Sequence, residues 1–146
     1  MTVKVAINGF GRIGRNVLRA LIENPRDDVE VIAVNTIPSL SESAYLLEFD
    51  SVHGRLSTNI TTEGDMMYVG NSKIRFLSEQ DPEALDWGAL AVDVVMECTG
   101  IFTDAEKATV HLRGGAKKVL VSAPSNGADL TVVYGVNHAT ILPEHK

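Results

Sequence analysis

The spacing of apolar residues changes twice within the first 35 positions, and the changes predict a strand, a helix and a second strand. Residues 3–8 form a short β-branched run that stops at Gly9, as a strand does at a glycine turn. From Gly11 the apolar residues recur at helical spacing until Pro25, which ends the helix. Residues 29–35 are again mostly apolar, which is typical of a strand buried on both faces. The three elements predict a βαβ unit with a parallel sheet.

Short apolar runs separated by turn residues extend this pattern along the rest of the chain. We expect a polar loop over residues 38–43, a short helix or helix end over 44–49, and a hairpin of short antiparallel strands between Leu56 and Leu77. The later predicted elements are a short helix over 81–85 capped by Asp81, a strand over 92–98, a helix over 104–114, and strands over 117–122 and 131–136. The predicted fold class is α/β: a Rossmann-type, doubly wound, mainly parallel sheet with a small antiparallel hairpin insertion.

The size and charge of the chain limit the classes of protein to which it can belong. Its 146 residues are enough for a single domain, and its net charge of -6 argues against nucleic acid as a partner. No apolar stretch approaches the roughly 20 residues of a membrane span, and the N-terminal apolar run is too short for a signal peptide. With one cysteine, Cys98, no internal disulfide can form, which fits a cytoplasmic protein. The spacing of His, Cys, Asp and Glu suggests no metal site.

A glycine motif occupies the turn between the first predicted strand and helix. The segment from Gly9 to Gly14 matches G-x-G-x-x-G, in which the first glycine permits a tight turn. Gly11 removes a side chain so that a pyrophosphate can approach the backbone, and Gly14 lets the helix pack closely on the sheet. The N–H groups of the helix's first turn then face the phosphates, and Arg12 would add a positive charge. The motif therefore predicts a dinucleotide site.

The second predicted strand ends at Asn35 and Thr36, without the acidic residue that usually binds the ribose 2′-hydroxyl of NAD. A carboxylate there would repel the 2′-phosphate of NADP, so its absence removes an obstacle to NADP. Thr36 and the serines up to Ser43 can donate hydrogen bonds to a phosphate, but this loop contains no Lys or Arg. The sequence is equally consistent with a neutral replacement of the acidic residue, after which the protein still binds NAD but discriminates less strongly against NADP. The cofactor is therefore expected to be NAD or NADP.

Five blocks of sequence carry a resemblance to a known enzyme family. They are residues 8–15 (NGFGRIGR), 49–55 (FDSVHGR), 97–102 (ECTGIF), 122–124 (SAP) and 133–137 (VYGVN). In this order, and along essentially the whole chain, they resemble glyceraldehyde-3-phosphate dehydrogenases, and the chain resembles the N-terminal NAD(P)-binding domain of that family.

The resemblance implies contacts at matching positions. Arg12 and Ile13 would meet the pyrophosphate, and Ser122 would lie close to the nicotinamide. Thr36 takes the place of the family's usual ribose-binding aspartate, and Gln80 falls where members often carry a basic residue near the adenine. Three further residues, Thr99, Gly100 and Phe102, would line the adenosine and ribose. The complete set of candidate cofactor-binding residues is Asn8, Gly9, Phe10, Gly11, Arg12, Ile13, Gly14, Asn35, Thr36, Gln80, Thr99, Gly100, Phe102 and Ser122.

The resemblance also implies a phosphorylating aldehyde dehydrogenase, which oxidises and phosphorylates glyceraldehyde 3-phosphate in glycolysis or gluconeogenesis. The family's nucleophile lies in a Ser-Cys-Thr-Thr-Asn stretch, which does not occur here. We therefore expect residues 1–146 to be a single, nearly complete dinucleotide-binding domain with no catalytic residue of its own, the catalytic domain to be absent, and the chain alone to be inactive. Cys98 is interpreted as a buried, inert residue. His53 could be half of an Asp–His acid/base pair, but its context in the family is structural. No plausible nucleophile partner exists for His111, His138 or His145.

Two alternatives differ in substrate or in activity. Erythrose-4-phosphate dehydrogenases belong to the same family but tend to carry His where this chain has Ala123, which favours the triose phosphate. A stand-alone, non-catalytic dinucleotide-binding module is the second alternative. The family further implies a homotetramer, with glyceraldehyde 3-phosphate and phosphate as partners of the intact enzyme only.

Overall fold

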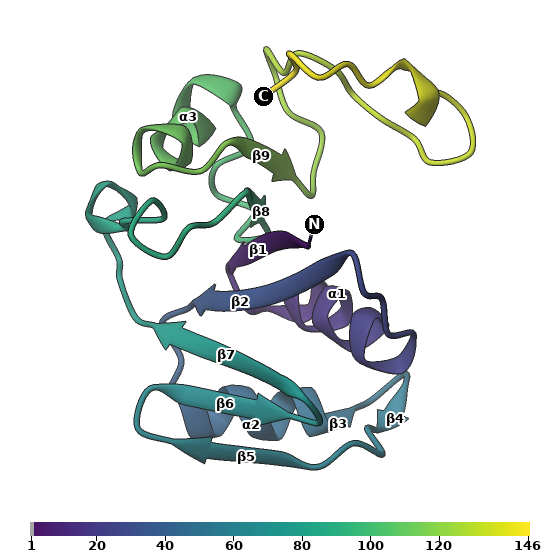
Figure 1. The fold of residues 1–146 in the computed structure, drawn as a ribbon, viewed down its shortest axis with the longest axis vertical. Helices are drawn as coiled ribbons and strands as arrows, with labels where there is room; N and C mark the ends of the chain where they lie inside the picture. Colours follow the sequence, from purple (N-terminus) through teal and green to yellow (C-terminus); the bar gives the residue numbers. More distant parts are fainter. Residues whose placement is uncertain (1) are drawn as a thin grey trace.

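A mainly parallel sheet forms the centre of the molecule. The computed structural model describes residues 2–146, and its seven-stranded sheet has the order β5-β6-β7-β2-β1-β8-β9 (Figure 1). The parallel strands are β1 (Val3–Asn8), β2 (Val29–Asn35), β7 (Ser72–Leu77), β8 (Val94–Glu97) and β9 (Lys118–Val121). Because β1 pairs with both β2 and β8, the sheet extends to both sides of it, as the doubly wound prediction requires.

The predicted antiparallel insertion continues this sheet on one side. The strands β5 (Ile60–Glu63) and β6 (Met66–Val69) pair antiparallel, and β6 pairs antiparallel with β7. The third strand of the insertion, β7, then runs parallel to β2 and joins it to the main sheet. A separate two-stranded sheet, β3 (Phe49–Asp50) and β4 (Gly54–Arg55), lies outside this order and was not predicted.

Side chains of β1 alternate between two apolar cores, one on each face of the sheet. Val5 and Ile7 belong to a core that includes Leu18 of α1 (Arg12–Glu23) and Leu47 of α2 (Leu40–Glu48). Ala6 points to the opposite core, which contains Trp87 and lies on the side of α3 (Ala105–Arg113). Two short 3-10 helices, η1 (Pro82–Ala84) and η2 (His138–Thr140), complete the elements. The alternation explains why consecutive residues Val5, Ala6 and Ile7 of the strand are all apolar.

The start of α2 differs from the prediction. Residues 40–43, expected in a polar loop, form the first turn of this helix, which ends at Glu48. Ser39 caps it by accepting a hydrogen bond from the Glu42 N–H at 3.3 Å. The spacing Ser-x-x-Glu is that of a capping box, and this signal was overlooked. The predicted cap Asp81 is confirmed at η1, and Asp104 caps α3.

The predicted strand over residues 131–136 is wrong. This segment lies beyond β9 and forms loops and turns, and Tyr134 is 88% exposed. The side chain of Asn137 accepts from the Val133 N–H and donates to the Thr131 carbonyl, which closes the segment on itself. The segment beside β9 is instead the end of the chain, where the Val119 N–H donates to the Lys146 carbonyl. The β-branched residues produced a strand-like pattern without a strand to pair with.

No helix within residues 2–146 is long and apolar enough to cross a membrane.

Candidate dinucleotide-binding site

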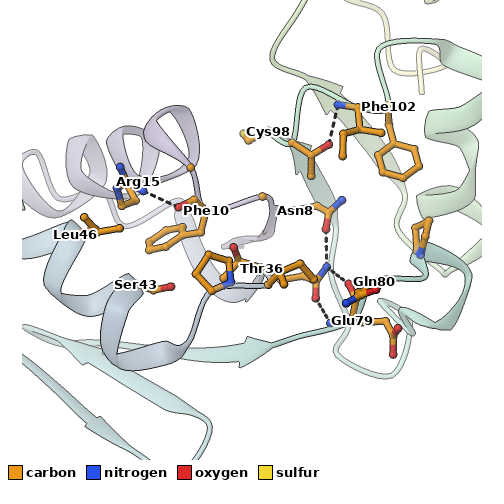
Figure 2. A pocket seen from close by; sticks show the side chains of 18 residues that line it. Asn8, Phe10, Arg15, Thr36, Ser43, Leu46, Glu79, Gln80, Cys98 and Phe102 are labelled. Carbon is orange, nitrogen blue, oxygen red and sulfur yellow. Dashed lines mark hydrogen bonds between the residues drawn. The ribbon is translucent and has the colours of Figure 1, made fainter.

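A cavity of about 530 Å³ lies at the carboxyl ends of β1, β2, β7 and β8, where doubly wound sheets bind ligands (Figure 2). It is mostly lined by apolar atoms and is open to solvent on one side. The structure brings the following predicted site residues together around it: Asn8, Gly9, Phe10, Gly11, Asn35, Thr36, Gln80, Thr99 and Phe102. The other predicted residues, Arg12, Ile13, Gly14, Gly100 and Ser122, lie outside its lining.

The three glycines of the motif have the different environments that the motif assigns to them. Gly9 has a φ of +93°, and a Cβ added there would lie 2.7 Å from the Thr99 nitrogen. A Cβ on Gly14 would collide with the carbonyl oxygen of Gly9, because the helix packs against the turn. A Cβ on Gly11 would meet nothing within 4 Å. Gly9 and Gly14 therefore serve the fold, whereas Gly11 leaves space free at the mouth of the helix.

The N-terminus of α1 is available to an anion. Gly11 occupies the N-cap position and has no side chain to cap the helix, and the first turn contains no acidic residue. The first N–H groups of a helix have no partner within it, and the helix dipole places positive charge there. Ile13, in the same turn, is 51% exposed. This end of α1 therefore meets the requirements of a phosphate-binding helix terminus.

The arginine on the cavity is Arg15 and not Arg12. The guanidinium of Arg12 forms an ion pair with Asp50 at 2.8 Å and lies outside the lining. The pKa of Asp50 is held well below its usual range, chiefly by the backbone N–H groups of His53 and Val52 and additionally by Arg12. Arg15 lines the cavity, and its Nη1 donates to the Phe10 carbonyl at 3.0 Å. Its buried Nε has no hydrogen-bond partner within the part of the chain that the structure describes.

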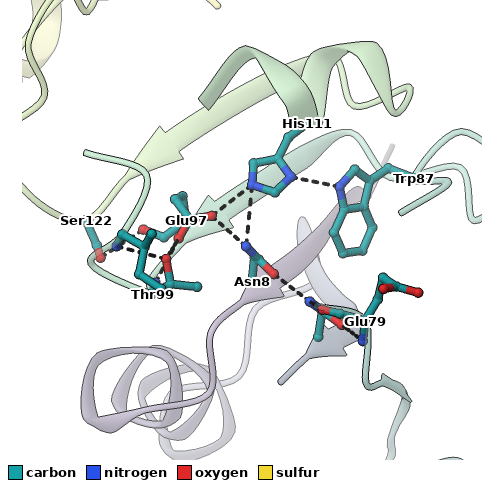
Figure 3. A network of polar contacts seen from close by, with 9 residues as sticks. Asn8, Glu79, Trp87, Glu97, Thr99, His111 and Ser122 are labelled. Carbon is teal, nitrogen blue, oxygen red and sulfur yellow. Dashed lines mark hydrogen bonds and ion pairs between the residues drawn. The ribbon is translucent and has the colours of Figure 1, made fainter. Parts of the chain in front are cut away.

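A row of buried polar side chains forms the floor of the site. Asn8, Asn35 and Glu97 end three adjacent strands in register and are at most 5% exposed. Asn35 Nδ2 donates to Asn8 Oδ1 at 2.8 Å, and Asn8 Nδ2 donates to Glu97 Oε2 at 2.7 Å (Figure 3). Asn35 also holds the loop after β7, because it accepts from the Glu79 N–H at 2.8 Å and donates to the Glu79 carbonyl at 3.0 Å.

The row continues behind the cavity to a histidine. His111 Nε2 lies 2.8 Å from Glu97 Oε2, and Trp87 Nε1 donates to His111 Nδ1 at 3.1 Å. On the cavity side, the Thr99 N–H donates to Glu97 Oε1 at 2.8 Å, and the Thr99 hydroxyl donates to the same oxygen. Burial alone would raise the pKa of Glu97, but the hydrogen bonds from His111, Asn8 and Thr99 outweigh it, so that its pKa is lowered.

The far end of the cavity, where β2 ends, is lined by uncharged residues of the loop and of α2. Thr36 is nearly buried, and its N–H donates to the Leu77 carbonyl at 3.0 Å. Ile37 and Pro38 follow it, and Ser43 and Leu46 face the cavity from α2 (Figure 2). Gln80 lies opposite, on the loop that Asn35 holds. β2 itself ends without a carboxylate that would repel a 2′-phosphate, and the carboxylate in the cavity lining is that of Glu79.

Two predicted residues lie beside the cavity and support its wall. Ser122 donates from both its N–H and its hydroxyl to the Glu97 carbonyl, each at 3.0 Å. Gly100 has a φ of +75° in the turn after Thr99.

Cys98 is buried, as predicted, and lines the cavity. Burial raises the pKa of its thiol, and a hydrogen bond with Ser122 only partly opposes this effect. The Cys98 thiol is therefore protonated at neutral pH.

The fold and the site agree with the comparisons with known proteins. Residues 3–105 match the family model described as glyceraldehyde 3-phosphate dehydrogenase, NAD binding domain. The chain belongs to the glyceraldehyde-3-phosphate dehydrogenase family. Similar relatives named glyceraldehyde-3-phosphate dehydrogenase come from Cereibacter sphaeroides (56% identical over 144 residues), Xanthobacter flavus (55% over 145) and Geobacillus stearothermophilus (52% over 144). Each alignment covers 99% of this chain but only 42–43% of the relative, so the chain spans less than half the length of these relatives.

These comparisons confirm the predicted family and the Rossmann-type fold. The chain carries the NAD-binding domain of the glyceraldehyde-3-phosphate dehydrogenase family, and neither alternative function is favoured. Within residues 2–146, no group of three or more His, Cys, Asp or Glu side chains is arranged to hold a metal ion.

Some residues of the site were not found by the sequence reasoning. Arg15 was overlooked because only the tertiary ion pair of Arg12 with Asp50 shows which arginine reaches the cavity. Glu97 and His111 were not recognised as partners. A signal did exist for the first of them: a polar residue ending an apolar strand, as Glu97 does, requires a buried partner. Nothing in the pattern of residues 104–114 indicates that His111 would reach it.

Proposed function

We propose that the cavity binds NAD with the pyrophosphate at the N-terminus of α1. The observation that carries the proposal is the open space at Gly11 in front of a helix end without a capping side chain. The cation of Arg15 borders the same cavity, and its buried Nε lacks a partner among the described residues. The proposed adenosine half lies between Thr36, Gln80, Thr99 and Phe102, all of which line the cavity.

We propose that NADP is also accepted, because no acidic side chain at the end of β2 opposes its 2′-phosphate. Thr36 and Ser43 supply hydroxyl groups at this end of the cavity. The loop between β2 and α2 contains no Lys or Arg to attract the extra phosphate. A modest difference in affinity between the two nucleotides is therefore expected.

A Gly11→Val variant tests the pyrophosphate position. A Cβ at this position meets no other atom within 4 Å, so the fold should persist while the added side chain lowers NAD affinity by at least about tenfold. Isothermal titration calorimetry at fixed salt with NAD and with NADP gives the affinities. Thr61→Val, on the exposed strand β5, is the control that introduces the same valine side chain away from the cavity, where it replaces a hydroxyl by a methyl group. Equal NAD affinity of Gly11→Val and wild type would contradict the proposal.

We further propose that the intact protein is a phosphorylating glyceraldehyde-3-phosphate dehydrogenase, a cytoplasmic homotetramer in which bound NAD accepts the hydride from the aldehyde. The names of the relatives and the family of the domain support this proposal. In the same proposal, this chain contributes the binding and orientation of the cofactor, and it contributes no nucleophile, because its one cysteine carries a protonated, buried thiol.

A further inference from the structure

His111 touches the wall of the cavity from behind without lining it. Its ring is completely buried on α3 and packs edge-on against Phe102, which lines the cavity, with the ring centroids 6.0 Å apart. Its two nitrogens bond to Trp87 and to Glu97 (Figure 3). A buried imidazole with both nitrogens engaged is fixed in orientation, so it can fix the orientation of its partners.

The hydrogen-bond partners of His111 determine which of its two ring nitrogens carries the hydrogen. An indole N–H only donates, so Nδ1 of His111 must be an unprotonated acceptor. The hydrogen of the neutral ring is then on Nε2, which donates to the Glu97 carboxylate. The contact between His111 Nε2 and Asn8 Nδ2 at 3.5 Å joins two donors and is no hydrogen bond. Both nitrogens point instead to the same carboxylate oxygen.

Four hydrogen bonds of the network converge on the Glu97 carboxylate. Its carboxylate accepts from His111, from Asn8, and twice from Thr99, which uses the roughly four acceptor positions of a carboxylate. The Asn8 amide is oriented by this bond, and its oxygen then accepts from Asn35. Asn35 uses its remaining donor and its oxygen to hold Glu79. Every link has one permitted direction, so the chain of bonds has a single arrangement.

We propose that His111 is a positioning residue for dinucleotide binding, which acts through Glu97 to fix both walls of the cavity. One wall is Thr99, which is bound directly to Glu97. The opposite wall is the loop of Glu79 and Gln80, which is held through Asn8 and Asn35. The inference rests on the proposed function, because it names a residue that controls the affinity of that same site.

Three variants test this role. His111→Leu removes the donor to Glu97 with a side chain of similar size, and His111→Gln restores a donor near the position of Nε2. Val69→Ala, in the buried face of β6 away from the cavity, is the control for a general loss of stability. NAD affinity is measured by calorimetry, and urea unfolding shows how much each variant is destabilised. Amide hydrogen exchange at Thr99 and Glu79, whose N–H groups end the two branches of the network, is measured without ligand.

We expect His111→Leu to bind NAD about tenfold more weakly than wild type, and to exchange the Thr99 and Glu79 amides faster. His111→Gln should recover most of both properties, and Val69→Ala should change neither. Equal NAD affinity of His111→Leu and Val69→Ala would overturn the positioning role, as would unchanged exchange at the two amides. Failure of the wild-type chain to bind NAD would refute the proposed function. In that case the exchange rates of the Thr99 and Glu79 amides would still show whether His111 fixes the two walls of the cavity.

Discussion

Glu97 keeps its negative charge in an almost fully enclosed position, which depends on its hydrogen-bond donors. Burial penalises the ionised carboxylate and would raise its pKa, yet His111, Asn8 and Thr99 together lower it. These donors are neutral, so the buried charge is stabilised by oriented dipoles and not by an ion pair. Loss of one donor leaves the other hydrogen bonds to Glu97 in place, but it disturbs the row of hydrogen-bonded side chains that crosses the floor of the cavity.

The pH dependence of stability follows from this lowered pKa. Because the folded state binds the proton of Glu97 less tightly than the unfolded state, the contribution of Glu97 is complete above the unfolded pKa of about 4.3 and is lost as pH falls through the lower folded pKa. Glu97→Gln should therefore lower the free energy of unfolding at pH 7, and the difference from wild type should narrow below pH of about 4. Urea unfolding at several pH values measures the loss of unfolding free energy at pH 7 and the narrowing of the difference at low pH. Glu63→Gln, on the exposed strand β5, is the control, and a gap that stayed constant with pH would contradict the assignment.

At the scale of elements, the turn from β1 to α1 combines a structural requirement and the proposed requirement of ligand binding in six residues. Gly14 brings α1 into contact with the carbonyl of Gly9, and this contact sets the distance of the helix from the sheet. Gly11, three residues earlier, has free space around it. The same residue type therefore has opposite tolerance to substitution at two positions of one motif.

A matched pair of alanine variants separates these requirements. Gly14→Ala should destabilise the fold by about 1–3 kcal/mol despite the higher helix propensity of alanine, because its Cβ would overlap the Gly9 carbonyl. Gly11→Ala should cost less than about 1 kcal/mol, the usual effect of alanine at an N-cap. Urea unfolding gives both values. Similar losses in the two variants would show that the packing at Gly14 is not decisive.

The sequence predicts those elements whose pattern is local. The βαβ unit, the glycine turn and the cap at Asp81 follow from short-range rules, and the structure confirms them. The prediction of a strand over residues 131–136 was wrong because β propensity reports how well a side chain fits a sheet, and no described strand lies beside this segment. Asn8 and Asn35 of the cavity floor were predicted as site residues, but the bond from Asn8 to Glu97 was missed for a related reason: these two residues are 89 positions apart, and only the sheet order makes them neighbours.

At the scale of the whole molecule, the described chain forms a cofactor-binding unit with no exposed nucleophile of the type that aldehyde oxidation needs. The one thiol is buried in the wall of the cavity, and its pKa is raised by burial. The network around Glu97 and His111 is fully occupied by its own hydrogen bonds, so it offers no free base to activate the thiol.

We therefore expect the purified 146-residue chain to bind NAD without oxidising glyceraldehyde 3-phosphate. Absorbance at the wavelength of NADH, recorded with aldehyde, phosphate and NAD present, should stay at the rate of a blank without protein. Cys98→Ser should leave this result unchanged and serves to identify the source of any signal. Turnover that disappears in Cys98→Ser would contradict the assignment of this cysteine as inert.

The strand order has a consequence for the growing chain on the ribosome. By the time residue 77 has emerged, β1, β2 and the antiparallel strands can already be paired, and one edge of β1 is still bare. That edge is covered only when residues 94–97 arrive, and Thr99 and Phe102 follow them into the cavity wall. A nascent chain thus carries the complete glycine turn, which ends at Gly14, some ninety residues before Phe102 completes the cavity wall. Until residues 94–97 emerge, the bare edge of β1 can pair with another chain, which makes the nascent chain prone to aggregation.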